Sequence, residues 1–452
     1  MSGGRLSRTA PAPPVRIVHL GLGNFFRAHQ AWYTAAAPDA ADWGIAAFTG
    51  RSTALADALS GQDGLYTLVV RAAHGDTCAV VGSVVAAHPG TDLDTWYDHL
   101  AQPEVCIVTL TVTEAGYLRG PDGGLDATRP DVGSDLAALR SGPRATVATV
   151  PARLVAGLAA RRAADAGPLT VVPCDNLPDN GAVTARVVTD LATILDPALA
   201  GWIGANVSFV TTMVDRITPA TTADDIRSVA ELTGRADAAP VVTEPYSDWV
   251  LGGDFPGGRP AWDSAGARFV ADVTPYERRK LWLLNGGHSL LAYAGIARGH
   301  ETVEQAVTDP YCRRVLEQWW DEAAPHLPLP ADQISAYRSA LIERWSNPRI
   351  QHRLAQIAAD GSLKLPVRIL PVLRAERAAG RMPAGAVGVV AAWIAHLRGA
   401  GAPVKDAAAD TLLGAAAGAP VEAVRHVLTM LDTDLADDDA LRAELASALG
   451  AR

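Results

Sequence analysis

Short apolar runs that are typical of buried β-strands recur through the first half of the chain. Val15–Leu20 reads VRIVHL, Trp43–Thr49 reads WGIAAFT and Val105–Val112 reads VCIVTLTV. Leu169–Val172 and Val207–Val210 are two further runs of this kind. Because a parallel sheet covered on both faces needs near-continuous apolar and β-branched strands, these runs predict an α/β domain.

Helical periodicity replaces this pattern after Tyr276. In Tyr276–Tyr293, which reads YERRKLWLLNGGHSLLAY, leucine and tryptophan recur at helical spacing and predict one amphipathic helix. Thr302–Trp320 and Ala331–Trp345 have the same spacing, and the Ala-rich C-terminal stretch suits packed helices. The second domain is therefore predicted to be mostly α-helical.

The two patterns meet in a segment that is rich in Gly, Pro, Trp and Asp, from about residue 243 to 272. Such a composition is typical of a connection over the surface. A chain of 452 residues is also long for one hydrophobic core. We expect a Rossmann-type domain over residues 12–272 and a helical domain over 273–452.

Composition narrows the class of partner. Hydrophobic residues make up 49% of the chain and charged residues 19%, and the formal net charge is −10. A nucleic-acid surface or an anionic membrane would favour clustered Lys and Arg, so we expect neither partner. The N-terminus lacks an apolar core of signal-peptide length, and the cysteines form no zinc-type spacing. A cytoplasmic protein that binds a small molecule is expected.

A glycine turn follows the first predicted strand. Gly21 and Gly23 would let the backbone turn sharply and approach a phosphate at the start of the next helix. Phe26 stands where a third glycine is usual, so the turn is also compatible with an ordinary strand–helix connection. After the second strand, Arg51 and Ser52 stand where an acidic residue would read a ribose. Arginine beside serine suits a 2′-phosphate and so favours NADP, but Arg51 could instead stack on adenine or lie in solvent, so NAD also stays open as the cofactor.

Three polar side chains interrupt the apolar helix at 276–293. Lys280, Asn285 and His288 offer a proton acceptor, an amide donor and an imidazole. On an α-helix at about 100° per residue they fall near 0°, 140° and 80°, on one broad face. Lys280 and His288 would be roughly 12 Å apart along the axis unless the helix breaks at Gly286–Gly287. Alternatively, Lys280 reaches solvent and His288 is a core histidine whose hydrogen bonds are satisfied.

Polar residues also follow the predicted strands. They include Glu114, Asn176 and Asp215, and ligands of open α/β sheets bind at the carboxyl ends of the strands. Asn176 could instead be only a turn residue, and Asp215 could pair with Arg216 or cap a helix. Further along, Gln356 and Lys364 flank an Asp360–Gly361 turn.

With these segments assembled, the chain resembles the mannitol dehydrogenase family, the polyol-specific long-chain dehydrogenases and reductases. The segments that carry the resemblance are GLGNFFRAHQ at 21–30, TLTVTEAGY at 109–117, PCDNLPDNG at 173–181, VDRITP at 214–219, EPYSDWV at 244–250 and KLWLLNGGHS at 280–289. The resemblance implies a Rossmann-type domain, a helical C-terminal domain and a metal-independent hydride transfer between NAD(P) and a polyol or ketose.

The resemblance also implies roles for single residues. Lys280 would be the general base in oxidation, Asn176 and Asn285 would hold the reacting oxygen, His288 would orient the substrate, and Glu277 would influence proton exchange. A lysine in a pocket beside a positive nicotinamide should lose its proton more easily. The cofactor residues are assigned as Gly21, Gly23, Phe25, Arg27, Arg51, Glu114, Val214 and Asp215. The substrate residues are assigned as Asn176, Asp215, Lys280, His288, Gln356 and Lys364.

Several alternatives stay open on the sequence. Family members often carry Arg where this chain has Gln356, which leaves the substrate in doubt. A polyol of the mannitol type is the first hypothesis, and a hexuronate is the second. Its carboxylate would need a cation such as Arg349, Arg353, Lys364 or Arg368. A non-catalytic dinucleotide-binding protein is the third, although it would not need the Lys280, Asn176 and Asn285 set.

Overall fold

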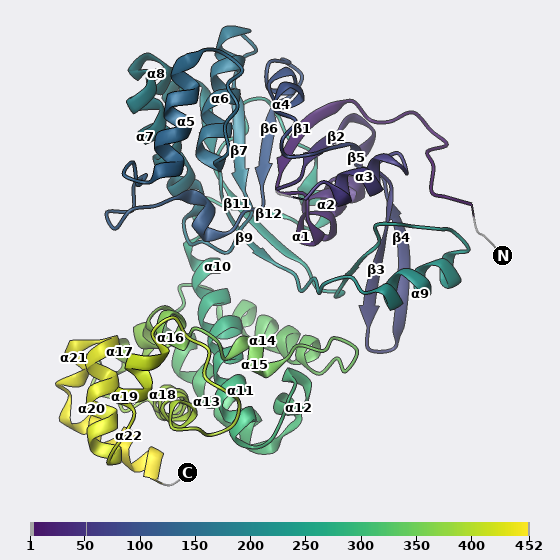
Figure 1. Cartoon of the computed structure of the whole chain (residues 1–452). Helices are drawn as coiled ribbons and strands as arrows, with labels where there is room; N and C mark the ends of the chain where they lie inside the picture. Colours follow the sequence, from purple (N-terminus) through teal and green to yellow (C-terminus); the bar gives the residue numbers. More distant parts are fainter. Residues whose placement is uncertain (1–3, 51, 451–452) are drawn as a thin grey trace. The chain divides into compact units, whose positions relative to one another are not determined.

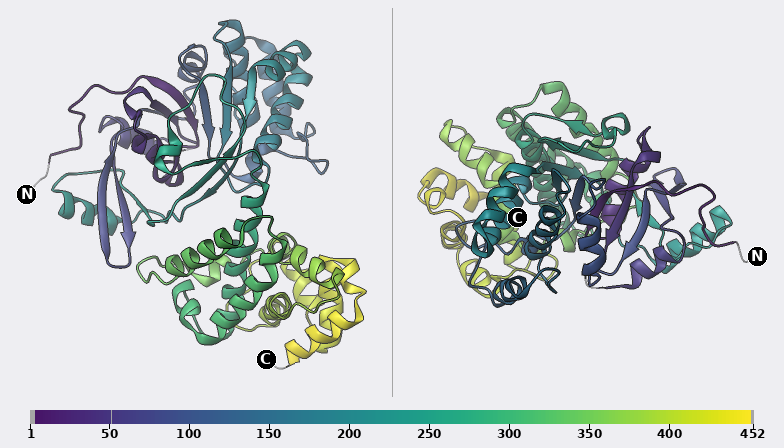
Figure 2. Two further views of the ribbon diagram at one scale, coloured as in Figure 1. Left: turned by 180° about the vertical axis from the view of Figure 1, so that it is seen from behind. Right: turned by 90° about the horizontal axis from the view of Figure 1, so that it is seen from above.

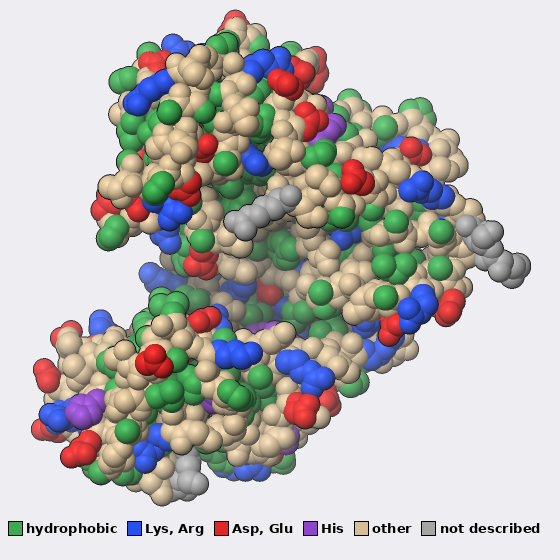
Figure 3. Space-filling model, viewed as in Figure 1, with side chains coloured by type: hydrophobic (Ala, Val, Ile, Leu, Met, Phe, Trp, Pro, Cys, Tyr) green, Lys and Arg blue, Asp and Glu red, His purple; other side chains and the backbone are tan. Residues whose placement is uncertain are grey.

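The computed structural model describes residues 4–50 and 52–450, and the chain forms two compact units, Met1–Thr274 and Pro275–Arg452. The first is an α/β unit and the second is helical (Figure 1), which confirms the predicted fold class. In the described part of the chain, no helix is long and apolar enough to cross a membrane. On the face drawn in Figure 3, basic and acidic side chains are interspersed.

A six-stranded parallel sheet organises the first unit. Its strands run in the order β5 (Val84–His88), β2 (Gly44–Phe48), β1 (Val15–Leu20), β6 (Ile107–Leu110), β7 (Leu169–Pro173) and β8 (Val207–Phe209). All five predicted strands are present, and β5 was not predicted. The strand order reverses at β1, between β2 and β6. A ligand of such a sheet binds outside the carboxyl ends at this reversal point.

Helices bury both faces of this sheet (Figure 2). One face packs against α4 (Leu93–Leu100), α5 (Pro130–Ser141), α6 (Val150–Ala163), α7 (Asn180–Leu195) and α8 (Pro197–Asn206). The other packs against α1 (Asn24–Ala28), α2 (Gln30–Ala36) and α3 (Ala54–Ser60). Val18 and Leu20 of β1 enter the first core and Ile17 the second. This double burial explains why the strands are apolar without alternation.

The prediction that residues 243–272 form a surface connection was wrong. β11 (Asp248–Gly252) lies between β9 (Thr211–Asp215) and β12 (Arg268–Phe269) in a three-stranded sheet. β10 (Val241–Thr243) pairs with the unpredicted hairpin of β3 (Tyr66–Ala72) and β4 (Gly75–Val81), and α9 (Ala223–Thr233) precedes it. Trp249 and Trp262 are fully buried. The Gly and Pro residues only separate short apolar strands.

The second unit is built around two buried helices, α11 (Gly287–Ala297) and α18 (Ala384–Leu397). The remaining helices are α10 (Thr274–Arg279), the π-helix η4 (Lys280–Gly286), α12 (Val303–Thr308), α13 (Pro310–Ala323), α14 (Ala331–Trp345), α15 (Leu354–Ile357), α16 (Gly361–Arg368), α17 (Leu370–Ala378), α19 (Ala409–Ala415), α20 (Pro420–Leu431), α21 (Thr433–Ala436) and α22 (Asp439–Gly450). α14 has the predicted bounds. The predicted single helix at 276–293 is instead divided into α10, η4 and α11.

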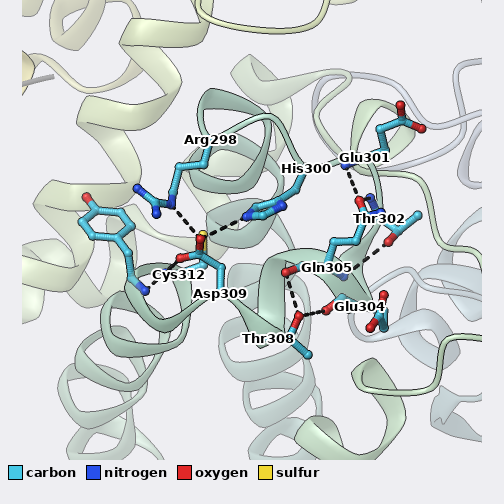
Figure 4. Close-up of polar contacts among 10 residues, drawn as sticks. Arg298, His300, Glu301, Thr302, Glu304, Gln305, Thr308, Asp309 and Cys312 are labelled. Carbon is cyan, nitrogen blue, oxygen red and sulfur yellow. Dashed lines mark hydrogen bonds and ion pairs between the residues drawn. The ribbon is translucent and has the colours of Figure 1, made fainter.

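The predicted helix Thr302–Trp320 is also divided, at Asp309. The carboxylate of Asp309 accepts the backbone N–H groups of Tyr311 and Cys312 at 2.8 and 3.1 Å and so caps α13. It also accepts Arg298 at 3.0 Å and His300 at 3.1 Å, both just after α11 (Figure 4). These bonds tie the start of α13 to the end of α11.

Candidate active site

The glycine turn after β1 is held between two neighbouring strands. The N–H groups of Gly21 and Leu22 donate to the carbonyl of Phe48 at 3.0 and 2.9 Å. Gly21 has φ +111°, and a Cβ there would lie 2.1 Å from the carbonyl oxygen of Thr111. Gly23 has φ −145°, and its Cβ would meet only the Gly21 oxygen, at 3.5 Å. The fold therefore requires glycine at 21 but not at 23.

Phe26 explains how the turn works without a third glycine. Its ring is fully buried and stacks on His19 of β1, with ring centroids 3.5 Å apart. The His19 ring lies 2.8 Å from the Thr109 hydroxyl and 3.1 Å from the Thr111 hydroxyl. Burial lowers the pKa of His19 to about 3, so the ring is neutral. An aromatic stack thus takes the place of close helix–strand contact, and the residue pattern did not predict this stack.

Arg27, predicted to contact the cofactor, is buried inside the first unit. Its guanidinium donates to the carbonyl of Ala239 and, at 2.6 Å, to the side chain of Asn24. Burial lowers the pKa of Arg27. These hydrogen bonds of Arg27 stabilise α1, the helix that follows the turn. Phe25 is half-buried and stacks on His29, whereas Arg51 lies outside the described residues.

Hydrogen bonds of neighbouring side chains hold the loop that carries Asn176. Asn176 is exposed in the loop that follows β7, two residues after Cys174. The Tyr117 hydroxyl donates to the carboxylate of Asp175, which also accepts the N–H of Leu177 at 3.0 Å. Asn180 donates to the Thr212 carbonyl at 3.1 Å. Burial raises the pKa of Asp175, and the bonds fix the backbone on both sides of Asn176.

The other residues assigned to the first unit differ in exposure. Glu114 is exposed, at the start of the 3-10 turn η2 (Glu114–Tyr117) after β6. Val214 and Asp215 are buried at the end of β9. They pair with Trp249 and Asp248 of β11, so the strand that was predicted to be a surface connection fixes them.

In the helical unit, Lys280 and Asn285 lie on the π-helix η4 and His288 lies on α11. The predicted angles, which assume a continuous α-helix, are therefore wrong, because a π-helix bonds residue i to i+5. The chain does not break at the glycine pair: Gly286 and Gly287 have φ −64° and −59°. Lys280 and Glu277 are half-buried.

One cavity of about 250 Å³ gathers most of the remaining predicted residues. It is lined by Asn285, His288, His352, Gln356, Ile357, Lys364 and Arg368. Lys280 and Glu277 are not among the lining residues. His352 was not predicted, because its place in the cavity depends on packing between elements that are far apart in the sequence. Its only sequence signal is a histidine in the polar stretch before Gln356.

His288 is the most buried polar group of this cavity, with 7% of its surface exposed. Its Nε2 is buried and has no hydrogen-bond partner among the described residues. The rings of His352 and Trp345 pack against it, each with centroids 4.9 Å away. Burial holds the pKa of His288 well below its usual value, and the neighbouring His352, Arg344 and Arg368 lower it further. A neutral imidazole can donate to or accept from a hydroxyl group.

Two cations, Lys364 and Arg368, also line the cavity. Lys364 Nζ donates to the carbonyls of Ile357 and Ala359 at 3.1 and 2.5 Å, and burial lowers its pKa. Arg368 Nη1 donates to the Asn285 carbonyl at 3.4 Å and to the Ser289 hydroxyl at 3.2 Å. Gln356 is exposed. The described lining holds no carboxylate, so hydroxyl groups and anions suit it better than cations.

Among residues 4–50 and 52–450, no three His, Cys, Asp or Glu side chains are grouped so that they could hold a metal ion. The polar side chains that line the cavity are amides, imidazoles and cations.

Comparisons with known proteins agree on the family. The sequence model described as the mannitol dehydrogenase Rossmann domain matches residues 15–264, and the mannitol dehydrogenase C-terminal domain matches 272–451. The chain is 40% identical to D-mannonate oxidoreductase from Escherichia coli (strain K12), over 85% of this chain and 80% of that protein. It is 38% identical to mannitol 2-dehydrogenase from Cereibacter sphaeroides, over 96% and 93%.

Two solved structures are similar along the whole chain. One is the Pseudomonas fluorescens mannitol 2-dehydrogenase ternary complex with NAD and D-mannitol, with a TM-score of 0.81 and 35% identity, covering 97% of this chain and 92% of that one. The other is a D-sorbitol dehydrogenase in substrate-free form, with a TM-score of 0.89 and 30% identity, covering 100% and 98%.

Proposed function

Because the chain belongs to the mannitol dehydrogenase family of oxidoreductases, we propose that it transfers a hydride between NAD and a secondary alcohol of an open-chain polyol, forming the ketose. The observation that carries the proposal is the cavity in the helical unit. Asn285, which lies five residues after Lys280, lines this cavity. A second amide, a neutral imidazole and two cations line it as well. The mannitol-bound relative of similar fold supports the choice of substrate.

The turn after β1 fits a dinucleotide. The fold requires glycine at position 21. A Cβ on Gly23, at the start of α1, would meet only the Gly21 carbonyl oxygen, at 3.5 Å. Backbone N–H groups there would face the pyrophosphate. We assign the remaining contacts to Phe25, Glu114, Val214 and Asp215. NAD supplies the hydride acceptor, and NADP remains the alternative through Arg51.

In the proposed reaction, Lys280 takes the hydroxyl proton while the carbon-bound hydrogen leaves with its electron pair as hydride. Lys280 must therefore start neutral, and it returns the proton in the reduction. Asn285 and Asn176 donate amide N–H groups to the oxygen as negative charge develops on it. His288 hydrogen-bonds a neighbouring hydroxyl. Glu277, about one turn before Lys280, passes the proton to solvent. No metal is required.

A second candidate substrate is a polyol that ends in a carboxylate, such as D-mannonate. The observation that favours it is the pair of cations, Lys364 and Arg368, in a lining without acidic groups. Gln356 weakens the case, because a neutral amide replaces a charged donor. The D-mannonate oxidoreductase relative is consistent with this candidate.

A substrate panel tests the proposal. NADH formation should be measured with D-mannitol, D-arabinitol and D-mannonate at equal concentration, with NAD and NADP, and with and without a chelator. We expect turnover of the neutral polyols with NAD that the chelator does not change. Turnover of mannonate alone, with a KM that rises in Arg368→Met, would move the assignment to the second candidate. No turnover of any of them would contradict both.

The two glycines of the turn give a matched pair of variants. Gly21→Ala should lower the free energy of unfolding by more than about 1 kcal/mol, because the new Cβ meets the Thr111 backbone at a positive φ. Gly23→Ala should leave the melting temperature unchanged and weaken NAD binding, because its Cβ enters the space proposed for the pyrophosphate. Thermal unfolding and NAD titration check the pair. Equal melting temperatures for both variants would contradict it.

A further inference from the structure

Two adjacent tryptophans of α13 bond the π-helix that carries Lys280. Trp319 and Trp320 are both fully buried. The indole N–H of Trp319 donates to the carbonyl of Trp282 at 2.9 Å, and that of Trp320 donates to the carbonyl of Leu283 at 2.9 Å. Both acceptors lie within η4. Neighbouring carbonyls of one helix are thus held by neighbouring side chains of another.

Such external bonds matter more for a π-helix than for an α-helix. π-Helical segments are rare and mostly single turns, which indicates that the backbone alone rarely favours them. A carbonyl oxygen has a second lone pair, so an indole donor can bond it without displacing a backbone bond. The two indole bonds therefore hold the carbonyls of Trp282 and Leu283 from outside the backbone of η4.

The glycine pair after Asn285 permits the close approach of the aromatic rings. A Cβ on Gly286 would lie 2.9 Å from the Trp319 ring, and a Cβ on Gly287 would lie 2.8 Å from the Trp345 ring. Since both glycines have helical φ values, their function is to leave space, not to turn the chain.

The helix that carries the tryptophans is itself fixed to the helix that carries His288. At its start, α13 is tied to the end of α11 through Asp309, Arg298 and His300 (Figure 4). Further along, Trp319 and Trp320 bond the segment directly before α11. Hydrogen bonds therefore connect α13 to the residues just after α11 and to the π-helix just before it.

We propose that Trp319 and Trp320 are positioning residues, which hold Lys280–Gly286 as a π-helix and thereby set Lys280 and Asn285 relative to His288. The inference rests on the proposed function, since it concerns the same three groups. An α-helix over this segment would rotate Lys280 relative to His288. A displacement of about 1 Å at reacting groups can lower turnover on the order of 100-fold.

Replacement of each tryptophan by phenylalanine tests the inference, because the phenyl ring keeps much of the aromatic bulk and removes the N–H donor. Trp319→Phe and Trp320→Phe should each lower kcat for polyol oxidation, and the double variant should lower it roughly 10- to 100-fold. The KM for NAD should stay the same. The dependence of kcat on pH should change as well, because Lys280 would no longer meet the hydroxyl group. A loss of stability alone would not alter kcat per folded enzyme or its pH dependence.

Trp96→Phe is the matched control, because Trp96 is equally buried and its indole N–H also donates to a backbone carbonyl, that of Arg153 at 3.0 Å, within the first unit. Its kcat should equal that of the wild type. If the double variant does not fold, the single variants decide. Gly286→Ala, which displaces the Trp319 ring, should reproduce the loss in kcat.

Wild-type kcat and pH dependence in both single variants would overturn the inference, as would an equal loss in Trp96→Phe. Failure of the proposed function gives a different result, because Lys280→Ala would then keep its activity whatever the tryptophan variants do.

Discussion

Lys280→Ala is expected to lower kcat for polyol oxidation by about 10² to 10⁴-fold, which is the usual contribution of a positioned general base. The hydride cannot leave the carbon unless the hydroxyl proton is also removed, and the polar side chains that line the cavity with Asn285 are amides, imidazoles with lowered pKa and the cations Lys364 and Arg368. NAD affinity should not change, since the glycine turn lies in the other unit. Steady-state kinetics and NAD titration of the purified variant measure both quantities.

Two further variants make this result specific. Lys405→Ala removes an exposed lysine of the same unit whose backbone carbonyl accepts the Asp360 N–H, and it should retain wild-type kcat. Lys280→Arg should not restore activity, because a guanidinium does not lose its proton near neutral pH. A small primary amine added to Lys280→Ala should restore part of the rate. Wild-type turnover of Lys280→Ala would rule out its role.

Asn285→Ala is expected to lower kcat by about 10² to 10³-fold, the loss seen when one donor to a developing oxyanion is removed. Asn285→Asp should lower it at least as far, because a carboxylate repels the alkoxide. The backbone of Asn285 should stay in place in both variants, since its carbonyl accepts Arg368 and Ser289. The kinetics should show the loss in kcat rather than in the KM for NAD. A loss of less than about threefold would remove Asn285 from the oxyanion role, whose single-donor losses are far larger.

The sequence allowed the sheet to be predicted because burial on both faces leaves a strong signal. Strands β1, β2, β6, β7 and β8 are all near-continuous apolar runs. β11 was missed because it lies between Gly and Pro residues that are also typical of a surface connection, although Trp249 and Trp262 are fully buried. Where Gly and Pro separate short strands, composition alone does not distinguish a loop from a sheet.

The candidate site was predictable in its chemistry but not in its geometry. Residue type and family motif were enough to infer the chemistry of Asn285, His288, Gln356 and Lys364. All four line one cavity. The π-helix was not predictable, since apolar residues at 281–284 fit an α-helix equally well and the bonds that hold η4 come from Trp319 and Trp320. His352 was missed for the same reason, because it contacts His288 only in the folded chain.

The role proposed for Lys280 is to take the alcohol proton during hydride transfer from a polyol to NAD. The decisive measurement is the dependence of kcat/KM on pH for polyol oxidation by the wild type and Lys280→Ala. In the wild type, kcat/KM should rise with pH as one group loses its proton and then level off. That plateau should be absent in Lys280→Ala, whose low rate should keep rising with hydroxide. Profiles of the same shape and height in both proteins would contradict the assignment.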